Sequence, residues 1–216
     1  MEDVIIRIED AAVSFEKFSV KPAIIEIPKG YVIGIQGSNG AGKTTFLNMI
    51  MGQYKNMQGK ISIDGCDVIR QKTEIMNKLG FISQEREFFM EEDAKANELM
   101  YAPFYAKWDS EVYSSMLKKM NISKARILKT FSTGEMIMYQ LAFAAAYKPQ
   151  VLILDEPTAN LDSVFRDDFL KLLQEFVAEY ETTILLSTHL QEDLSKIADY
   201  IIEIHDGNYK MREAEV

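Results

Sequence analysis

The sequence predicts an α/β fold, because short apolar strands alternate with helical stretches and a glycine-rich turn joins one such pair. The apolar run Val151 to Leu154, bounded by Pro149 and Pro157, is typical of a parallel strand buried on both faces. It ends directly in two carboxylates, Asp155 and Glu156. Ligands of open α/β sheets bind beyond such strand ends, so this pair marks a candidate active site.

The N-terminal region has the alternating pattern of antiparallel strands. Polar and apolar residues alternate over Val4 to Ile27 and over Ile61 to Ile69, where Asp64 and Gly65 form a turn signal. The single cysteine, Cys66, follows that turn and is expected to be an ordinary strand residue. We therefore expect an antiparallel β subdomain at residues 1–30 and 60–70.

A glycine-rich segment follows the apolar strand Tyr31 to Ile35 and opens a helix from about Lys43 to Met51. It fits the P-loop pattern G-x-x-x-x-G-K-[ST], in the strand-to-helix context that the pattern requires. The segment consists of Gly37, Ser38, Asn39, Gly40, Ala41, Gly42, Lys43, Thr44 and Thr45. Glycines let successive backbone N–H groups turn toward phosphate oxygens, and the helix N-terminus adds the positive end of its dipole. Nucleotide binding is the prediction, and a glycine-rich turn without nucleotide is the alternative.

Four side chains take chemical roles in this site. Lys43 is expected to reach the β- and γ-phosphates, and the Thr44 hydroxyl to bind Mg²⁺ with Asp155 on the other side of the metal. Glu156, one residue further along, is predicted to be the general base for the attacking water. These assignments predict a P-loop nucleotidase.

The chain between the P-loop and Asp155 is longer than one crossover needs, which indicates an inserted helical subdomain at residues 85–135. Four apolar residues recur there at helical spacing: Val112, Met116, Leu117 and Met120. Core packing is the expectation for this stripe, and a partner-binding surface is the alternative, as it is for Phe104, Tyr105 and Trp108. Three residues further upstream are expected to be exposed: Phe88, Phe89 and Met90.

The segment Phe131-Ser132-Thr133-Gly134-Glu135 precedes a helix that continues to Tyr147. Ser132 can cap this helix, with Glu135 three residues later completing a capping box. On these residues alone, a well-formed helix start is the simpler interpretation.

The remaining chain continues the α/β alternation. The expected elements are a helix at Ser163–Tyr180, a strand at Thr183–Ser187, a helix at Gln191–Ile197 and a hairpin turning at Asp206 and Gly207. His189 follows a buried strand into the candidate site, whereas His205 precedes the hairpin turn and is expected to be structural or solvated.

Five motifs in this order resemble the ATP-binding subunits of ATP-binding cassette (ABC) transporters over essentially the whole chain. They are the P-loop at Gly37, FISQE around Gln84, FSTGE at Phe131, VLILDEPTANLD from Val151 and LLSTHL around His189. The resemblance implies a P-loop NTPase whose RecA-like parallel core comprises residues 31–84 and most of 136–216, with the antiparallel β and helical subdomains attached.

The resemblance also implies roles for residues beyond the P-loop. Gln84 would contact Mg²⁺ and the attacking water and couple the site to a transmembrane partner. His189 would bond the γ-phosphate and position the water beside Glu156. Both roles suit a reaction in which positioning and charge neutralisation provide most of the catalysis.

A second, facing subunit is part of what the resemblance implies. FSTGE stands where the family signature LSGGQ stands, so Ser132 and the Gly134 backbone would contact the γ-phosphate of ATP held by that subunit. Ala159 to Asp162 match the D-loop, which crosses between subunits. The chain departs from the family pattern at four positions of this region: Phe131, Thr133, Glu135 and Met138. The adenine-stacking aromatic should precede the P-loop, where Phe15 and Phe18 both qualify; the alternative is that both fill the core.

Composition limits the partners. The net charge of −9 argues against nucleic acid, which binds basic surfaces. No apolar run reaches the roughly 20 residues of a membrane span, and the N-terminus lacks the features of a signal peptide, so a cytoplasmic subunit held peripherally by a permease is expected. We therefore expect an ATPase that dimerises with a second copy or close paralogue and drives a transmembrane permease. A soluble ABC-type ATPase acting on ribosomes or DNA, and a weakly hydrolysing regulatory subunit, are the alternatives.

Overall fold

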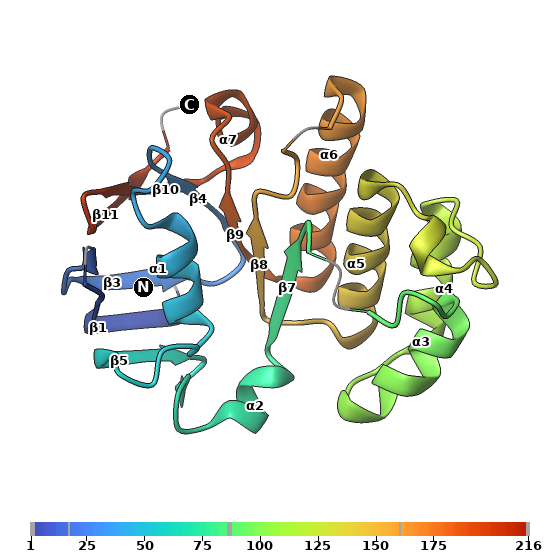
Figure 1. The fold of residues 1–216 in the computed structure, drawn as a ribbon, viewed down its shortest axis with the longest axis horizontal. Helices are drawn as coiled ribbons and strands as arrows, with labels where there is room; N and C mark the ends of the chain where they lie inside the picture. Colours follow the sequence, from blue (N-terminus) through green and yellow to red (C-terminus); the bar gives the residue numbers. More distant parts are fainter. Residues whose placement is uncertain (1–2, 17, 86–87, 160, 215–216) are drawn as a thin grey trace.

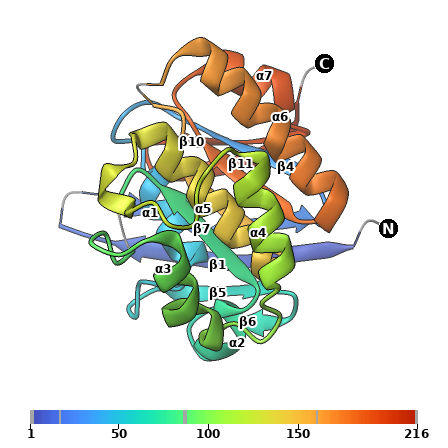
Figure 2. The same ribbon diagram turned by 90° about the vertical axis from the view of Figure 1, so that its right-hand side faces the viewer.

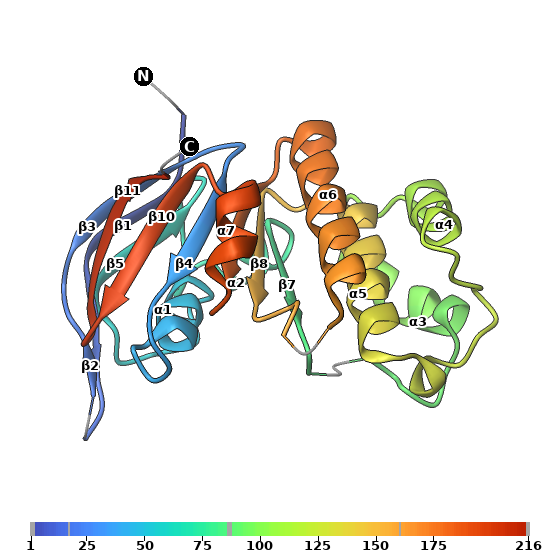
Figure 3. The ribbon, with the colours of Figure 1, turned by 90° about the horizontal axis from the view of Figure 1, so that it is seen from above.

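Two β-sheets and a set of helices form the molecule, seen in a computed structural model that describes residues 3–16, 18–85, 88–159 and 161–214 (Figure 1). Viewed from above, the antiparallel sheet lies at one end, the mainly parallel sheet follows, and α3 and α4 lie at the opposite end (Figure 3). The predicted combination of a parallel core, an antiparallel sheet and additional helices is confirmed.

The central sheet has six strands in the order β11-β10-β4-β9-β8-β7. Its strands are β4 (Val32–Gln36), β7 (Leu79–Ser83), β8 (Val151–Asp155), β9 (Thr183–Ser187), β10 (Tyr200–His205) and β11 (Asn208–Glu213). All neighbouring strands are parallel except β10 and β11, which form the C-terminal hairpin. Ser83, Asp155 and Ser187 are register partners across three adjacent strands. The carboxyl ends of these strands therefore meet along one edge.

The second sheet is antiparallel. It consists of β1 (Val4–Ser14), β2 (Ser19–Val20), β3 (Ile24–Pro28), β5 (Gln58–Ile63) and β6 (Cys66–Asp67). Helix α1 (Lys43–Ile50) lies between the two sheets and buries Phe46, Leu47 and Met49 in one cluster with isoleucines of the antiparallel sheet and Val151 and Ile153 of β8. This packing fixes the start of α1, and with it the P-loop, against both sheets.

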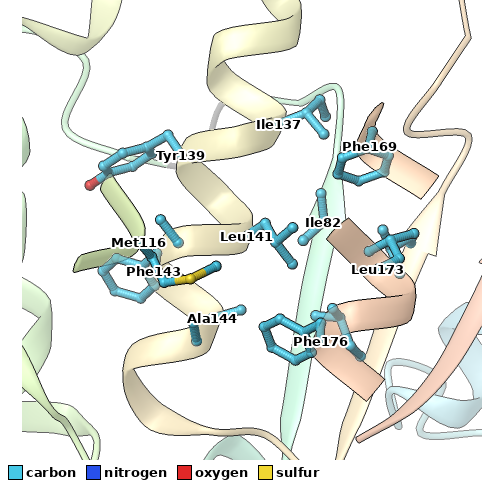
Figure 4. Packing of buried hydrophobic residues seen from close by; sticks show 14 of the residues in the cluster. Ile82, Met116, Ile137, Tyr139, Leu141, Phe143, Ala144, Phe169, Leu173 and Phe176 are labelled. Atoms are coloured by element: carbon cyan, nitrogen blue, oxygen red, sulfur yellow. The ribbon is translucent and has the colours of Figure 1, made fainter. Parts of the chain in front are cut away.

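Helices α5 (Thr133–Tyr147) and α6 (Ser163–Tyr180) lie on the other side of the central sheet. Figure 4 shows Leu141 of α5 and Leu173 of α6 converging with Ile82 of β7 in this second core. Beyond α5 lie α3 (Ala94–Tyr101) and α4 (Ser110–Lys119), which Figure 2 shows toward the viewer. The shorter helices are α2 (Lys72–Met76), α7 (Gln191–Ile197), η1 (Ala102–Phe104) and η2 (Leu128–Thr130).

Most expected elements lie within one or two residues of the observed ones. The apolar stripe of α4 packs as core, since Met116 and Leu117 are buried. The expectation of exposure for the segment after Gln84 is correct for Phe89, which is 50% exposed, and wrong for Phe88. Phe88 packs edge-on against Tyr101, Tyr139 and Phe143. Met90 is also partly buried against this core.

Candidate nucleotide-binding site

The P-loop joins β4 to α1 in a conformation that only glycine adopts readily. Gly40 and Gly42 have φ angles of 79° and 108°, and Gly42 caps α1. Lys43 is 8% exposed, and its Nζ donates to the Gly37 carbonyl at 3.0 Å. The ammonium is thus folded back over the loop, as a residue that binds phosphates held by the loop requires.

Asp155 lies at the carboxyl end of β8 and bridges the P-loop helix to β9. The Thr44 hydroxyl donates to one carboxylate oxygen at 2.9 Å, and the Ser187 hydroxyl donates to the other. A hydroxyl and a carboxylate in contact form an oxygen donor set of the kind that Mg²⁺ prefers. These residues therefore fit the predicted metal. No cluster of three or more His, Cys, Asp or Glu side chains with metal-binding geometry occurs in the described part of the chain.

Glu156 has a left-handed backbone, with a φ of 49°, and its N–H donates to both the carbonyl and the hydroxyl of Ser187. This turn directs the side chain back toward the P-loop. Its Oε2 lies 2.7 Å from Nδ1 of His189, and its Oε1 lies 3.6 Å from Nζ of Lys43. Three residues predicted for catalysis are therefore in direct contact, although they come from three different segments.

Gln84 follows β7 and is tied to the segment after β8. Its side-chain amide donates to the carbonyls of Glu156 at 3.2 Å and Ala159 at 2.6 Å. A cavity of about 520 Å³ is lined by Gln84, Thr44, Asp155 and Glu156, among others. On the other side, Gly37, Ser38, Asn39 and His189 help to line a second cavity of about 430 Å³. The predicted metal-binding residues line the first cavity, and Glu156 at its edge contacts His189 of the second.

Comparisons with known proteins show the family of this chain. The family model described as ABC transporter matches residues 20–159. The chain belongs to the ABC transporter family. It is 33% identical over 204 residues to the energy-coupling factor transporter ATP-binding protein EcfA2 of Clostridium tetani, with 89% of this chain and 71% of the relative covered. It is 32% identical over 202 residues to the ATP-binding protein NatA of Bacillus subtilis, covering 91% and 82%.

Solved structures show the same fold. The chain superimposes with a TM-score of 0.84 on cbiO1 from Clostridium perfringens, part of the ABC transporter complex cbiONQ, at 24% identity and covering 98% of this chain and 89% of that one. The ADP conformation of the ATP-binding cassette MJ1267 gives a TM-score of 0.83, at 22% identity and covering 98% and 92%. This chain is an ATP-binding, ATP-hydrolysing subunit of its family. No helix in the described residues has the length and apolarity of a membrane span.

The ABC signature segment stands apart from the P-loop cavities. Ser132 caps α5 by accepting from the Glu135 N–H at 3.2 Å, while Glu135 accepts from the Ser132 N–H at 2.8 Å, so the predicted capping box is confirmed. Gly134 packs on Phe165, since a Cβ there would lie 2.9 Å from the ring. Ser132 is exposed and lines neither cavity, which leaves it available to another molecule.

The predicted D-loop, Ala159 to Asp162, precedes α6 in the chain. Asp162 caps that helix, accepting from the Phe165 N–H at 2.9 Å. Asn160, at the centre of the predicted D-loop, lies outside the described residues. Because Phe165 also covers Gly134, the first turn of α6 is packed against the start of α5.

The two candidate adenine aromatics of this ATPase have different environments. Phe15 is 45% exposed. Within the described residues, its one ring contact is edge-on with Tyr54, and the two ring centroids lie 5.4 Å apart. Phe18 is half-buried against the P-loop, where a Cβ on Gly42 would lie 2.4 Å from its Cζ. Of these two residues, Phe15 has the more exposed ring.

Several residues that shape the site were not predicted from the sequence. The Ser187 hydroxyl donates to the Asp155 carboxylate and accepts from the Glu156 N–H. Its place at the end of a buried strand, two residues before His189, was the available signal. Thr158 donates to Asp193 at 2.9 Å, and both side chains are buried. This bond connects the segment after Glu156 to α7, which follows His189. No spacing rule for the sequence alone would have paired them.

Proposed function

We propose that this ABC ATPase hydrolyses ATP with Glu156 as the general base and His189 as the residue that orients it. The observation that carries the proposal is the contact of one Glu156 oxygen with His189 at 2.7 Å and of the other with Lys43 at 3.6 Å. A carboxylate held between two nitrogen-bearing side chains, beside the P-loop, is positioned to accept a proton from water. Lys43 and the loop N–H groups neutralise phosphate charge.

Mg²⁺ would be held by the Thr44 hydroxyl and Asp155, with Gln84 lining the same cavity. When bound, the ion would supply charge neutralisation at the phosphates. Ser187 keeps Asp155 oriented by donating to its second oxygen. The Gln84 amide donates to the backbone carbonyls of Glu156 and Ala159, so a movement of Gln84 would displace the backbone of Glu156.

Phe15 is our choice for the aromatic that stacks on adenine. Stacking needs an accessible ring face, and Phe15 is 45% exposed whereas Phe18 packs on Gly42. Phe18 would then act on ATP only through the loop, by supporting the backbone conformation of Gly42.

A second copy of the chain, or a close paralogue, would complete the site. Ser132 and Gly134 lie at the start of a 15-residue helix, where unpaired N–H groups and the helix dipole favour anions. They line neither cavity of their own chain, so their natural partner is ATP bound to another subunit. The Gly134–Phe165 contact would let the D-loop and the signature move as one unit.

The transmembrane partner would be a separate permease that holds the ATPase at the cytoplasmic face of the membrane. An apolar groove of about 220 Å³ lies between β7 and the helices beside it, lined in part by Met76, Tyr101 and Tyr147. Gln140 lines it too, and hydrogen-bonds both backbone groups of Ser83, the residue before Gln84. With exposed Phe104 and Phe89 on nearby segments, this surface suits an apolar helix of the permease.

Turnover and copurification together test the proposal. The purified chain should hydrolyse ATP only with Mg²⁺, with a rate that rises more steeply than in proportion to protein concentration, as a dimeric site requires. Lys43→Ala should abolish it. The tagged chain extracted from membranes in mild detergent should carry an integral membrane protein with it, and Met76→Glu should release that protein. Recovery with ribosomes or DNA, or a rate strictly proportional to concentration, would contradict the proposal.

A further inference from the structure

The signature helix of this chain begins with a carboxylate. Glu135 occupies the position of the glutamine in the family sequence LSGGQ, and its side chain lies within the first turn of α5. The free N–H groups and the dipole at a helix N-terminus attract a carboxylate as they attract a phosphate, so the two anions would compete for the same place. An ionised Glu135 therefore opposes the approach of a second subunit's ATP unless its charge is neutralised.

Arg126 provides the neutralising charge with close, two-pronged geometry. Its Nη1 bonds Oε1 of Glu135, and its Nη2 lies 3.0 Å from Oε2. The same Nη2 donates to the Thr130 carbonyl at 2.8 Å, and Nε donates to the Thr130 hydroxyl at 3.2 Å. The guanidinium also lies 4.8 Å from the centroid of the Phe131 ring. Arg126 thus holds the residues directly before Ser132 as well as the carboxylate after it.

Protonation cannot substitute for this arginine near neutral pH. The Arg126 guanidinium, with the Ser132 N–H, lowers the pKa of Glu135 to about 2, so the carboxylate stays charged. The capping box itself needs only Ser132 and Glu135, so the helix start does not depend on Arg126 for its hydrogen bonds.

We propose that Arg126 is a positioning residue for the ATPase reaction: it acts through Glu135, whose charge it cancels, so that the N-terminus of α5 can accept the phosphates of ATP bound by a second copy of the chain. This inference rests on the proposed function, because it requires ATP to be shared between subunits. It assigns to the Arg126–Glu135 pair the electrostatic neutrality that glutamine provides in the family signature.

The test is the dissociation constant of the dimer formed with Mg²⁺ and a non-hydrolysable ATP analogue, measured by sedimentation. Arg126→Gln should weaken dimerisation roughly tenfold, since like charges at an interface are strongly unfavourable. Glu135→Gln should dimerise at least as tightly as the unchanged chain. The double variant should return to within about twofold of Glu135→Gln, because the two sites are coupled. The matched control is Lys119→Gln, which removes one cation from the ion pair with Glu175 in the helical region.

Each outcome has one meaning. A double variant as weak as Arg126→Gln would make Arg126 a purely structural residue and overturn the inference, as would an Arg126→Gln chain that dimerises normally. Loss of dimerisation in Lys119→Gln to the same extent would assign the effect to overall charge instead. If the unchanged chain binds the analogue but stays monomeric, the proposed function itself fails. Binding of a fluorescent ATP analogue to the monomer, measured on every variant, separates damage to the chain's own P-loop from damage to the shared contact.

Discussion

The imidazole Nδ1 of His189 and the carboxylate Oε2 of Glu156 lie 2.7 Å apart, joining the segments that follow two adjacent parallel strands. The other carboxylate oxygen lies 3.6 Å from Nζ of Lys43. Glu156 therefore connects the P-loop to the segment that leads into α7. Phosphates bound in the loop would compete with this carboxylate for Lys43, and nucleotide binding would then be coupled to the position of Glu156.

Replacement of Glu156 by glutamine should reduce ATP turnover about 100-fold or more, because a positioned general base contributes 10²–10⁴ in rate. The amide keeps the size of the side chain and can still bond His189, so ATP binding should persist. Steady-state hydrolysis and nucleotide affinity, measured on the same preparation, check both parts.

Glu203→Gln is the control for this substitution, since Glu203 pairs with Arg212 on the β10–β11 hairpin and lines neither cavity of the site. It should leave turnover unchanged. Undiminished hydrolysis by Glu156→Gln would remove Glu156 as the base.

His189→Ala should also lower turnover, by roughly tenfold to a hundredfold, because it removes the group that orients Glu156. Residues that act as a unit are not additive, so the double variant with Glu156→Gln should be no slower than the worse single variant. His205→Ala is the matched control, because His205 is an exposed histidine at the hairpin turn. Additive losses in the double variant would show that His189 acts independently of Glu156.

Local sequence was sufficient to predict the P-loop, the strand ending in Asp155 and the capped helix at Ser132, because each depends on residues close together in the chain. The predicted capping box is present atom for atom. Contacts that depend on strand order could not be predicted in this way. Ser187 reaches Asp155 only because β9 is the neighbour of β8. Phe88 is covered because Tyr101 of α3 and Tyr139 and Phe143 of α5 meet it in space.

The choice between Phe15 and Phe18 shows the same limit. Both are aromatic residues before the P-loop, and only the folded chain distinguishes an exposed ring from one that covers Gly42. Arg126 could not be found either, because its pairing with Glu135 spans the turn η2, and an isolated arginine in a helical region carries no signal of its own.

Thr158→Val should destabilise the protein by about 1–3 kcal/mol, because it leaves the carboxylate of Asp193 buried without its hydroxyl donor. Thr158 and Asp193 are 1% and 2% exposed, so water cannot replace the bond without rearrangement. Thr158→Ser keeps the donor and should lose much less. Urea unfolding of the three chains checks the prediction, and equal losses for valine and serine would assign the effect to packing.

Phe15→Ala should weaken ATP binding several-fold while barely changing the melting temperature, because its exposed ring contributes to ligand stacking and little to the core. Phe18→Ala should lower the melting temperature and affect ATP only secondarily, through the backbone of Gly42. GTP binding provides a further comparison, since stacking on a phenyl ring distinguishes poorly between purines. If Phe18→Ala loses affinity without loss of stability, the two assignments must be exchanged.

The contribution of the Arg126–Glu135 pair to the free energy of unfolding should decrease at acid pH. The pKa of Glu135 falls from its ordinary value of 4.5 to about 2 on folding, so the charged form is favoured in the native state. The stability gained from this shift is complete above pH about 4.5 and is lost as the pH falls toward about 2. The difference in unfolding free energy between the unchanged chain and Glu135→Gln should thus be constant from pH 8 to 5 and smaller at pH 3.5, as measured by urea titration at each pH. Since both side chains are more than one-third exposed, added salt should also reduce the difference. A difference that stays the same at pH 3.5 would show that Glu135 stabilises the helix through its shape and hydrogen bonds alone.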